Sequence, residues 1–496
     1  MPYPEPHDIV LKLLSVDPAN YPDAPSEGIR RIIEQVTGTK IPKGEPIDLS
    51  PVESIRMGTT VATNALLERK GDRVAFIVTK GFGDILRIGQ QARPSIFDLS
   101  VSKLGLLYED VIEIDERVTI EGYSENNEPE TFDVEGDDQL VVGISGEVIR
   151  VLKTPEEDKI RQALLKVWES GIKSLAISLL HSFTYPKHEQ IVATIAREIG
   201  FDVSVSSDIQ PMIKIVSRAN SATADAYLSP ITTRYVQNFG KQFKGGLETV
   251  GHKLLFMQSD GGLTSWSTFS GLKAILSGPA GGVVGYAKTS FDEESNTPIL
   301  GFDMGGTSTD VSRYSGVLEH IFETTTAEVT IQSPQLDINT VAAGGGSILF
   351  WRKGLFAVGP ESASAHPGPA CYRKGGPLTV TDANLFVGRI LPEYFPHIFG
   401  PNEDQPLDEQ IVKQKFIELT AEINNDRPGL TPLSPEEVAM GFLTVANETM
   451  CRPIRSLTEG KGHVTAAHYL ASFGGAGGQH ACAVANNLGI SRVIIP

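Results

Sequence analysis

The fold of this chain is decided by the stretch Pro298-Ile-Leu-Gly-Phe-Asp-Met-Gly-Gly-Thr-Ser-Thr-Asp-Val-Ser-Arg-Tyr314. Its apolar run predicts a strand that delivers Asp303 to the strand end, and Gly305-Gly306 permits a tight turn. Alternation of side chains resumes at Asp310, and Ser315-Gly316 then turns the chain again. The stretch therefore predicts a β-hairpin, followed by a turn into a further strand.

The predicted turn has the chemistry of a phosphate-binding loop. Successive backbone N–H groups in such a turn form an anion-binding concavity, to which Gly305 and Gly306 contribute and three hydroxyls add donors: Thr307, Ser308 and Thr309. Asp303 and Asp310 flank the turn and can hold Mg²⁺ through water, so they are candidate catalytic and metal-binding residues. The alternative is an ordinary β-turn without a ligand. A Walker loop, G-x-x-x-x-G-K-[ST], does not occur in the sequence.

A second glycine cluster suits a nucleotide. His468–Phe473 predicts a strand, Gly474-Gly-Ala-Gly-Gly478 a loop, and Gln479–Asn487 a helix that ends at Leu488-Gly489. The candidate nucleotide-binding residues here are Gly474, Gly475, Gly477 and Gly478. The spacing does not fit G-x-G-x-x-G, so a Rossmann dinucleotide site is disfavoured.

The rest of the chain has the rhythm of α/β domains. Strands are predicted at Arg73–Thr79 and Ser174–Leu180, before a helix that starts near His188. A helical stretch from Arg218 to Phe243 separates this part from a glycine-rich one, which places a boundary near Asn220 and predicts domains 1–219 and 220–496. The glycine clusters of the second domain are expected to converge on one cleft; they begin at Asp260, Gly278, Gly305 and Gly474.

Composition limits the partners. The chain of 496 residues has 43 basic and 61 acidic side chains and a net charge of −18, which disfavours nucleic acid and anionic lipid surfaces. Three cysteines without a C-x-x-C pair indicate neither a disulfide framework nor a zinc site. No signal peptide and no apolar span are recognised, so we expect a protein of the cytosol.

A row of polar residues follows a short predicted strand. Arg56, Thr59, Thr60 and Asn64 lie where that strand turns into a helix, and hydroxyl donors at a helix N-terminus suit a substrate carboxylate. The alternative is that Thr59 or Thr60 caps the helix. We therefore treat these four residues as candidates for substrate binding.

These motifs carry a family resemblance. Gly301–Ser312 resembles the defining string of the hydantoinase A and oxoprolinase family, and further matches cover essentially the whole chain: Leu11–Pro18, Arg56–Arg69, Phe256–Leu263, Ser277–Gly282, Val341–Ser347, Gly359–Ser362, His366–Gly376 and Phe473–His480. The downstream strings resemble the oxoprolinase branch in particular.

The resemblance implies a fold and a reaction. The family is similar to sugar kinases, actin and Hsp70, so it implies an actin-like α/β fold of two domains, with Asp303–Asp310 as a phosphate hairpin, Gly474–Gly478 as an adenosine loop and Ser277–Gly282 at the start of a connecting helix. It also implies ATP and Mg²⁺ as cofactors. The implied reaction is ATP-dependent opening of 5-oxo-L-proline to L-glutamate in the glutathione cycle, through phosphorylation of the lactam oxygen.

Two departures from the family pattern leave alternatives open. Relatives have a further phosphate hairpin before the position of Met1 and continue beyond Pro496, in fused forms into a hydantoinase B-like half. We therefore expect a fragment incomplete at both ends that binds adenine nucleotide weakly and turns over poorly. The full-length protein is expected to be a homo-oligomer or to include that second half. The alternatives are a hydantoinase or acetone carboxylase-type subunit, or a non-catalytic nucleotide-binding remnant.

Overall fold

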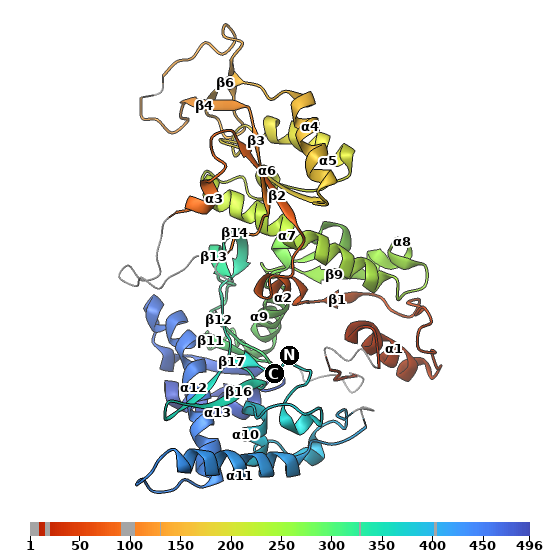
Figure 1. Cartoon of the computed structure of the whole chain (residues 1–496), viewed down its shortest axis with the longest axis vertical. Coiled ribbons are helices and arrows are strands. Elements are labelled where there is room, and N and C mark those ends of the chain that lie inside the picture. The colour runs from red at the N-terminus through yellow and green to blue at the C-terminus, as the bar shows by residue number, and fades with distance from the viewer. Residues whose placement is uncertain (1–8, 15–19, 91–104, 129, 327–328, 401–403) are drawn as a thin grey trace.

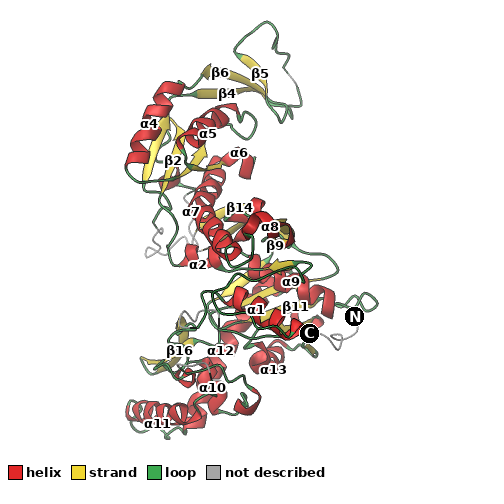
Figure 2. Cartoon of the chain, turned by 90° about the vertical axis from the view of Figure 1, so that its right-hand side faces the viewer, coloured by secondary structure: helices red, strands yellow, loops and turns green. Residues whose placement is uncertain are grey.

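The computed structural model describes residues 9–14, 20–90, 105–128, 130–326, 329–400 and 404–496. The molecule is elongated, with one α/β part at each end of its long axis and a layer built around the long helix α7 (Ile215–Gly240) between them (Figure 1). Helices lie on both sides of the strands in each part (Figure 2). No helix of the described residues combines the length and the apolarity needed to cross a membrane.

The first part is built on a parallel sheet in the order β3-β2-β7-β8 (Asp110–Ile114, Val74–Thr79, Ser174–Ser178, Asp202–Val205). Strand β2 is buried along its whole length. Val74, Phe76 and Val78 join the core cluster that includes α7, whereas Ala75 and Ile77 join the cluster of α4 (Glu157–Glu169) and α5 (Lys187–Ile199). A strand covered on both faces needs apolar residues at every position, which explains its unbroken apolar run.

Smaller elements complete the first part and the middle layer. An antiparallel sheet joins β4 (Arg117–Gly122), β6 (Val148–Lys153) and β5 (Leu140–Val142), and α3 (Ile85–Ile88) and α6 (Ser206–Ile209) are short helices. The middle holds the sheet β1-β9-β10 and the ribbon β13-β14, with bounds Ile55–Met57, Leu254–Met257, Leu263–Ser265, His320–Thr326 and Val329–Leu336. Its helices are α1 (Ala24–Thr37), α2 (Val61–Leu67), α8 (Gly246–Val250) and α9 (Ser277–Ser290). The boundary proposed near Asn220 lies inside α7.

The second part contains the decisive hairpin. Its sheet has the order β15-β12-β11-β18-β19 (Ile338–Val341, Thr309–Tyr314, Ile299–Met304, Tyr469–Phe473, Val493–Ile494). β11, β12 and β15 are antiparallel neighbours, and β18 runs parallel to β11. The ribbon β16-β17 (Ser347–Arg352, Leu355–Ser362) and the helices α10 to α13 surround it (Val380–Phe386, Glu409–Asn425, Pro435–Leu457, Gly477–Leu488).

Alternation along β11 decides which side chains reach the site. Leu300, Phe302 and Met304 are buried in the core cluster that includes α12 and α13. The opposite face meets α9, because Gly301 leaves no room for a Cβ beside the Tyr286 ring. Asp303 follows the same two-residue period and therefore lies on the α9 face, at the end of the strand.

The predicted hairpin is confirmed, with two differences beside it. Asp303 pairs with Asp310 in the β11–β12 register, and the N–H of Gly305 donates to the carbonyl of Ser308 at 3.0 Å to close the turn. After a turn at Gly316 the next strand, β13, leaves this sheet and pairs with β14. Helix α13 begins at Gly477, two residues before the predicted start, so Gly477 and Gly478 belong to its first turn.

Candidate nucleotide and metal site

The carboxylates of Asp303 and Asp310 form the centre of the site. The two residues are opposite each other in the antiparallel ladder, so their side chains share the face of the sheet that meets α9. The hydroxyl of Thr340, on the neighbouring strand β15, donates to Asp310 Oδ1 at 2.5 Å. The sheet thus holds two acids side by side at the mouth of the glycine turn.

Both acids are electrostatically unfavourable in their ionised forms. Burial, followed by the charge of Asp310, raises the pKa of Asp303 to about 6. Burial also raises the pKa of Asp310, although the hydrogen bond from Thr340 opposes this shift. A hard cation with oxygen ligands would relieve both costs, and Mg²⁺ is commonly held by one or two carboxylates together with water and phosphate oxygens. The donor set therefore fits Mg²⁺.

The glycine turn is supported from one side and open on the other. Its carbonyls at Gly305 and Gly306 accept hydrogen bonds from Gly345 N (3.0 Å) and Gly346 N (2.6 Å). Gly306 and Thr307 are exposed, and no described residue accepts a hydrogen bond from their N–H groups. The turn can therefore present two backbone donors, with the hydroxyls of Thr307 and Ser308, to an anion.

Thr309 does not belong to this set. It pairs with Met304 in the ladder, which puts its side chain on the core face of the sheet. The residue is fully buried, and its hydroxyl donates to the carbonyl of Ala343 at 2.5 Å. We correct the prediction that its hydroxyl faces a phosphate, because the two-residue period of the strand separates it from the open turn.

The second glycine cluster meets the hairpin directly. Gly474 has φ +81° and is packed against the Asp303 carboxylate and the Met304 carbonyl, so a Cβ there has no room. The N–H of Ala476 donates to Met304 O at 2.9 Å. The expected convergence of the Gly305 and Gly474 clusters is thereby confirmed.

A cavity of about 430 Å³ opens beside this loop and is lined by Arg389, Ser472, Phe473, Gly474, Gly475, Gly478, Gln479, Ile495 and Pro496. Gly477 is not among these residues. It is buried beneath the loop, where a Cβ would meet the Ser472 hydroxyl at 2.8 Å. Of the four predicted glycines, three line the cavity, and Gly477 lets the helix approach the sheet.

Sequence reasoning missed the polar groups that line the cavity or support its lining residues. Arg389 follows α10, and its Nη1 donates to the carbonyl of Gln479 at 3.5 Å. Asn384 Nδ2 donates to Gln479 Oε1 at 3.1 Å and contacts His480 Nε2 at 2.8 Å. Burial, and then the charge of Arg389, lowers the pKa of His480 to about 3, so this imidazole is a neutral structural group. No spacing in the sequence connects these residues with the glycine loop.

The candidate substrate residues lie where α2 and α9 begin. Thr59 is buried; its N–H donates to Ser277 Oγ (3.2 Å) and its Oγ1 accepts from the N–H of Val61 (3.2 Å), the first residue of α2. The N-cap residue of α2 is Thr60, and its side chain makes no capping hydrogen bond to a described residue. Thr60 and Asn64 are exposed and contact each other through Asn64 Nδ2 and Thr60 Oγ1 at 3.5 Å. Arg56 is exposed on β1.

One turn of α9 connects these residues with the acids. A Cβ on Gly278 would lie 3.3 Å from Thr60 Cγ2, and a Cβ on Gly282 would lie 3.4 Å from Asp303 Oδ2. The Gly278 cluster therefore approaches Asp303 through Gly282. The loop at Asp260 packs elsewhere than the Gly278 cluster. The Asp260 carbonyl contacts His320 Nε2 at 3.1 Å, and Gly261 packs against Leu336, so this loop faces the β13–β14 ribbon.

Comparisons with known proteins agree with this arrangement. Residues 218–496 match the family described as Hydantoinase/oxoprolinase, and residues 4–200 match the Hydantoinase/oxoprolinase N-terminal region. The 5-oxoprolinase of Saccharomyces cerevisiae is 58% identical over 491 residues, which cover 99% of this chain and 38% of that relative. The chain thus spans less than two fifths of the length of this curated relative.

Two solved structures share the fold. Nucleotide-free acetone carboxylase superposes with a TM-score of 0.71 at 22% identity, covering 95% of this chain and 63% of that one. ATP-dependent caprolactamase from Pseudomonas jessenii superposes with a TM-score of 0.70 at 26% identity, covering 98% and 65%. The fold is thus the predicted α/β fold of the actin-like type. With a phosphate-type hairpin, a facing glycine loop and matches along both halves, the chain belongs to the hydantoinase/oxoprolinase family.

Proposed function

We propose that this protein opens the lactam ring of 5-oxo-L-proline to give L-glutamate, coupled to the hydrolysis of ATP to ADP and phosphate. The observation that carries the proposal is the facing pair Asp303 and Asp310, set between the open Gly306-Thr307 turn and the Gly474 loop. The 58% identity to a 5-oxoprolinase supports the choice of substrate.

The chemistry explains why ATP is needed. A lactam carbonyl is a weak electrophile because its nitrogen donates electrons into it. The lactam oxygen attacks the γ-phosphorus and ADP leaves, which activates the ring carbon. Water adds to that carbon, the ring C–N bond breaks, and the nitrogen leaves as a protonated amine. A second water then converts the acyl phosphate to the glutamate carboxylate and inorganic phosphate.

The residues of the site divide this work. The N–H groups of Gly306 and Thr307, with the hydroxyls of Thr307 and Ser308, bind phosphate oxygens, and preorganised donors of this kind commonly dominate phosphoryl transfer. Asp303 and Asp310 would hold Mg²⁺, which when bound neutralises charge on the phosphates. The cavity beside Gly474 and Arg389 takes the adenosine. Asp303 and Asp310 also orient the attacking water.

We propose that the substrate binds beside the N-terminal ends of α2 and α9. Thr60 contacts α9 at Gly278 and Asp303 contacts it at Gly282, four residues later, which is a rise of about 6 Å along a helix. That span matches a small ring with a carboxylate at one end. We propose that Thr60, Asn64 and Arg56 bind the carboxylate of 5-oxo-L-proline, while its lactam oxygen points towards Asp303 and the phosphates.

The setting of the reaction is part of the proposal. We propose that the protein acts in the cytosol, within the glutathione cycle that produces and consumes 5-oxo-L-proline. We propose that the protein forms a homo-oligomer or assembles with a hydantoinase B-like half, in keeping with a caprolactamase relative that is described as a subunit alpha.

A turnover assay tests this function. Purified protein is incubated with ATP, Mg²⁺ and 5-oxo-L-proline, and glutamate and phosphate are measured; we expect equal release of the two. Asp303→Asn and Asp310→Asn should each lower turnover by about 10²-fold or more. The control is Asp72→Asn, which removes an acid from a surface ion pair with Arg234.

Parallel assays separate the alternatives. Release of phosphate with hydantoin, or with acetone and bicarbonate, in preference to 5-oxo-L-proline would replace the proposal by a hydantoinase or an acetone carboxylase-type subunit. Nucleotide binding without turnover of any of these compounds would identify a non-catalytic protein.

A further inference from the structure

A lysine from the start of the chain lies at the glycine loop of the second part. A Cβ on Gly475 would lie 3.7 Å from Lys12 Nζ, although the two residues are far apart in the sequence. Lys12 is exposed, and among the described residues no carboxylate lies within ion-pair distance of its amine. An unpaired cation therefore stands beside a loop that lines the adenosine cavity.

The neighbours of Lys12 anchor its segment on both sides. Leu14 packs against the core cluster of the second part, and its carbonyl accepts a hydrogen bond from the Tyr21 hydroxyl at 2.6 Å. Leu13 reaches α1, where a Cβ on Gly28 would lie 3.7 Å from Leu13 Cδ1. The backbone of Lys12 is thus positioned by its neighbours, whereas none of the described residues forms a hydrogen bond or an ion pair with its side chain.

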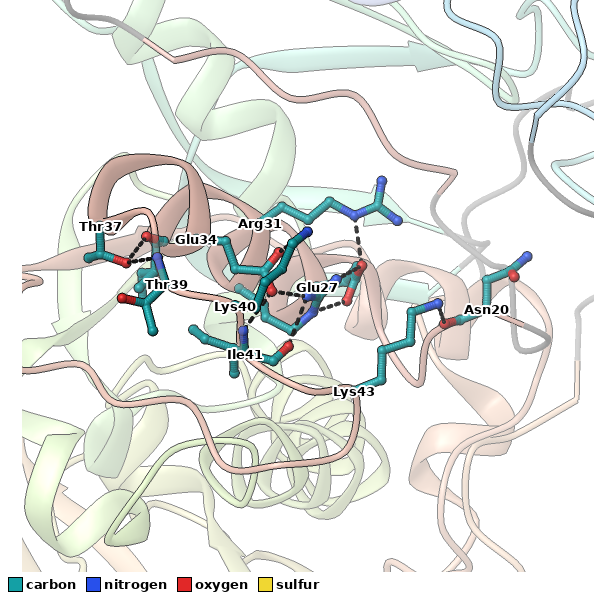
Figure 3. Close-up of polar contacts among 11 residues, drawn as sticks. Asn20, Glu27, Arg31, Glu34, Thr37, Thr39, Lys40, Ile41 and Lys43 are labelled. Carbon is teal, nitrogen blue, oxygen red and sulfur yellow. Dashed lines mark hydrogen bonds and ion pairs between the residues drawn. The ribbon is translucent and has the colours of Figure 1, made fainter.

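Helix α1 provides a firm support for this segment. The Asp23 carboxylate caps its first turn by accepting from Ser26 N at 2.8 Å. The buried Glu27 carboxylate accepts from Arg30 and from Arg31, the latter at 2.7 Å (Figure 3). Lys43 Nζ donates to the carbonyl of Asn20 at 3.1 Å. This hydrogen bond, drawn as a dashed line in Figure 3, ties the chain before α1 to the chain after it.

The surroundings of the Gly474–Gly478 loop are negatively charged, so a cation there would favour the binding of phosphate. Gly474 touches the Asp303 carboxylate, the turn from Asp303 to Asp310 contains no basic residue, and the chain carries a net charge of −18. A triphosphate bound at this loop is therefore repelled by the negative charge of the protein. Arg389 also approaches the loop, at Gln479, whereas Lys12 lies at Gly475, next to the residue that contacts Asp303.

We propose that Lys12 binds the phosphates of the nucleotide held by the Gly474–Gly478 loop, so that the N-terminal segment completes the nucleotide site of the second part. This inference rests on the proposed ATP-dependent function. Lys12 acts as a phosphate-binding residue: its ammonium group donates charge-assisted hydrogen bonds that adenosine alone cannot accept.

The test compares binding of ATP, ADP and adenosine by calorimetry in three variants. Lys12→Gln should weaken ATP and ADP by about 10-fold or more, with less effect at high salt, and leave adenosine affinity unchanged. Lys12→Arg should retain most of the ATP affinity. The control Lys40→Gln removes the same charge from a side chain that is 94% exposed and 3.9 Å from Glu34, and it should bind ATP normally.

The outcomes are distinct. Unchanged ATP affinity in Lys12→Gln, with normal binding by the unmodified protein, would overturn this inference and leave the proposed function standing. An equal loss for adenosine and ATP would also overturn it, because that pattern indicates a distorted loop. Failure of the unmodified protein to bind ATP would overturn both. The rise in Tm on adding ATP, taken relative to the Tm of the same variant without nucleotide, provides a second measurement of ATP binding.

Discussion

Gly474 and Asp303 are in direct contact: the backbone of the glycine lies against the carboxylate, and no side chain fits between them. The contact exists because β18 runs parallel to β11, with Phe473 opposite Asp303 in the register, so that the loop after β18 begins where the acid stands. The two glycine motifs of the chain thereby become one site.

Gly474→Ala should break this contact. Its φ of +81° is strained for alanine, at about 1–2 kcal/mol, and the new methyl group would also collide with the Asp303 carboxylate. Gly38→Ala is the matched control, since Gly38 has φ +68° with nothing within 4 Å of its Cβ position. We expect a larger fall in unfolding free energy for Gly474→Ala, together with at least tenfold weaker ATP binding. Equal destabilisation in the two variants would contradict the packing argument.

Asp303→Asn should stabilise the protein at neutral pH although it lowers turnover. The folded pKa of Asp303 is raised to about 6 from an ordinary 3.8, so the unfolded state ionises first as the pH rises. The wild type therefore loses stability between about pH 4 and 7 relative to the variant. The expected difference at pH 8 is on the order of 1–3 kcal/mol. Denaturant unfolding without nucleotide or metal measures it, and a difference that does not change with pH would refute the burial argument.

Thr340→Val should act on catalysis through Asp310. The Thr340 hydroxyl donates to Asp310 Oδ1 and opposes the upward shift of its pKa, so its loss should raise that pKa further. The acidic limb of the pH–rate profile should then move to higher pH, and kcat should fall by about tenfold. Thr340→Ser should restore both. Thr194→Val, which removes a hydroxyl bonded to a helix carbonyl in α5, is the control and should leave the profile in place.

Thr309→Val and Thr307→Ala should change different quantities: the first should lower stability and the second should lower ATP affinity. Valine at 309 leaves the buried Ala343 carbonyl without its donor, which typically costs about 1–3 kcal/mol of stability but should not alter ATP affinity. Thr307 is exposed in the open turn, so its truncation should weaken ATP binding with little change in Tm. Thermal unfolding and calorimetry on both variants check this separation. A specific loss of ATP affinity in Thr309→Val would restore Thr309 to the phosphate set.

Local sequence determined the hairpin. The apolar run before Asp303, the glycine pair and the renewed alternation after Thr309 each favour the same local conformation, and the structure has the strands where these signals place them. The strand and helix around Gly474 were predictable for the same reason. Only the helix start was misplaced, since glycine at 477 indicates a loop by propensity but is selected here by the close approach of Ser472.

Tertiary structure decided which side chains belong to the site. Thr309 and Asp310 are neighbours in sequence, yet one is a core residue and the other lies on the face that meets α9, because the sheet is covered by α12 on one side and by α9 on the other. Arg389 and Lys12 reach the glycine loop from remote segments, and no periodicity in a single chain encodes such contacts. Local sequence patterns indicate the backbone conformation and the buried face of an element, and both depend on residues only a few positions apart. The pairing of distant segments depends on how whole faces pack together, and that determined the charge around the nucleotide site.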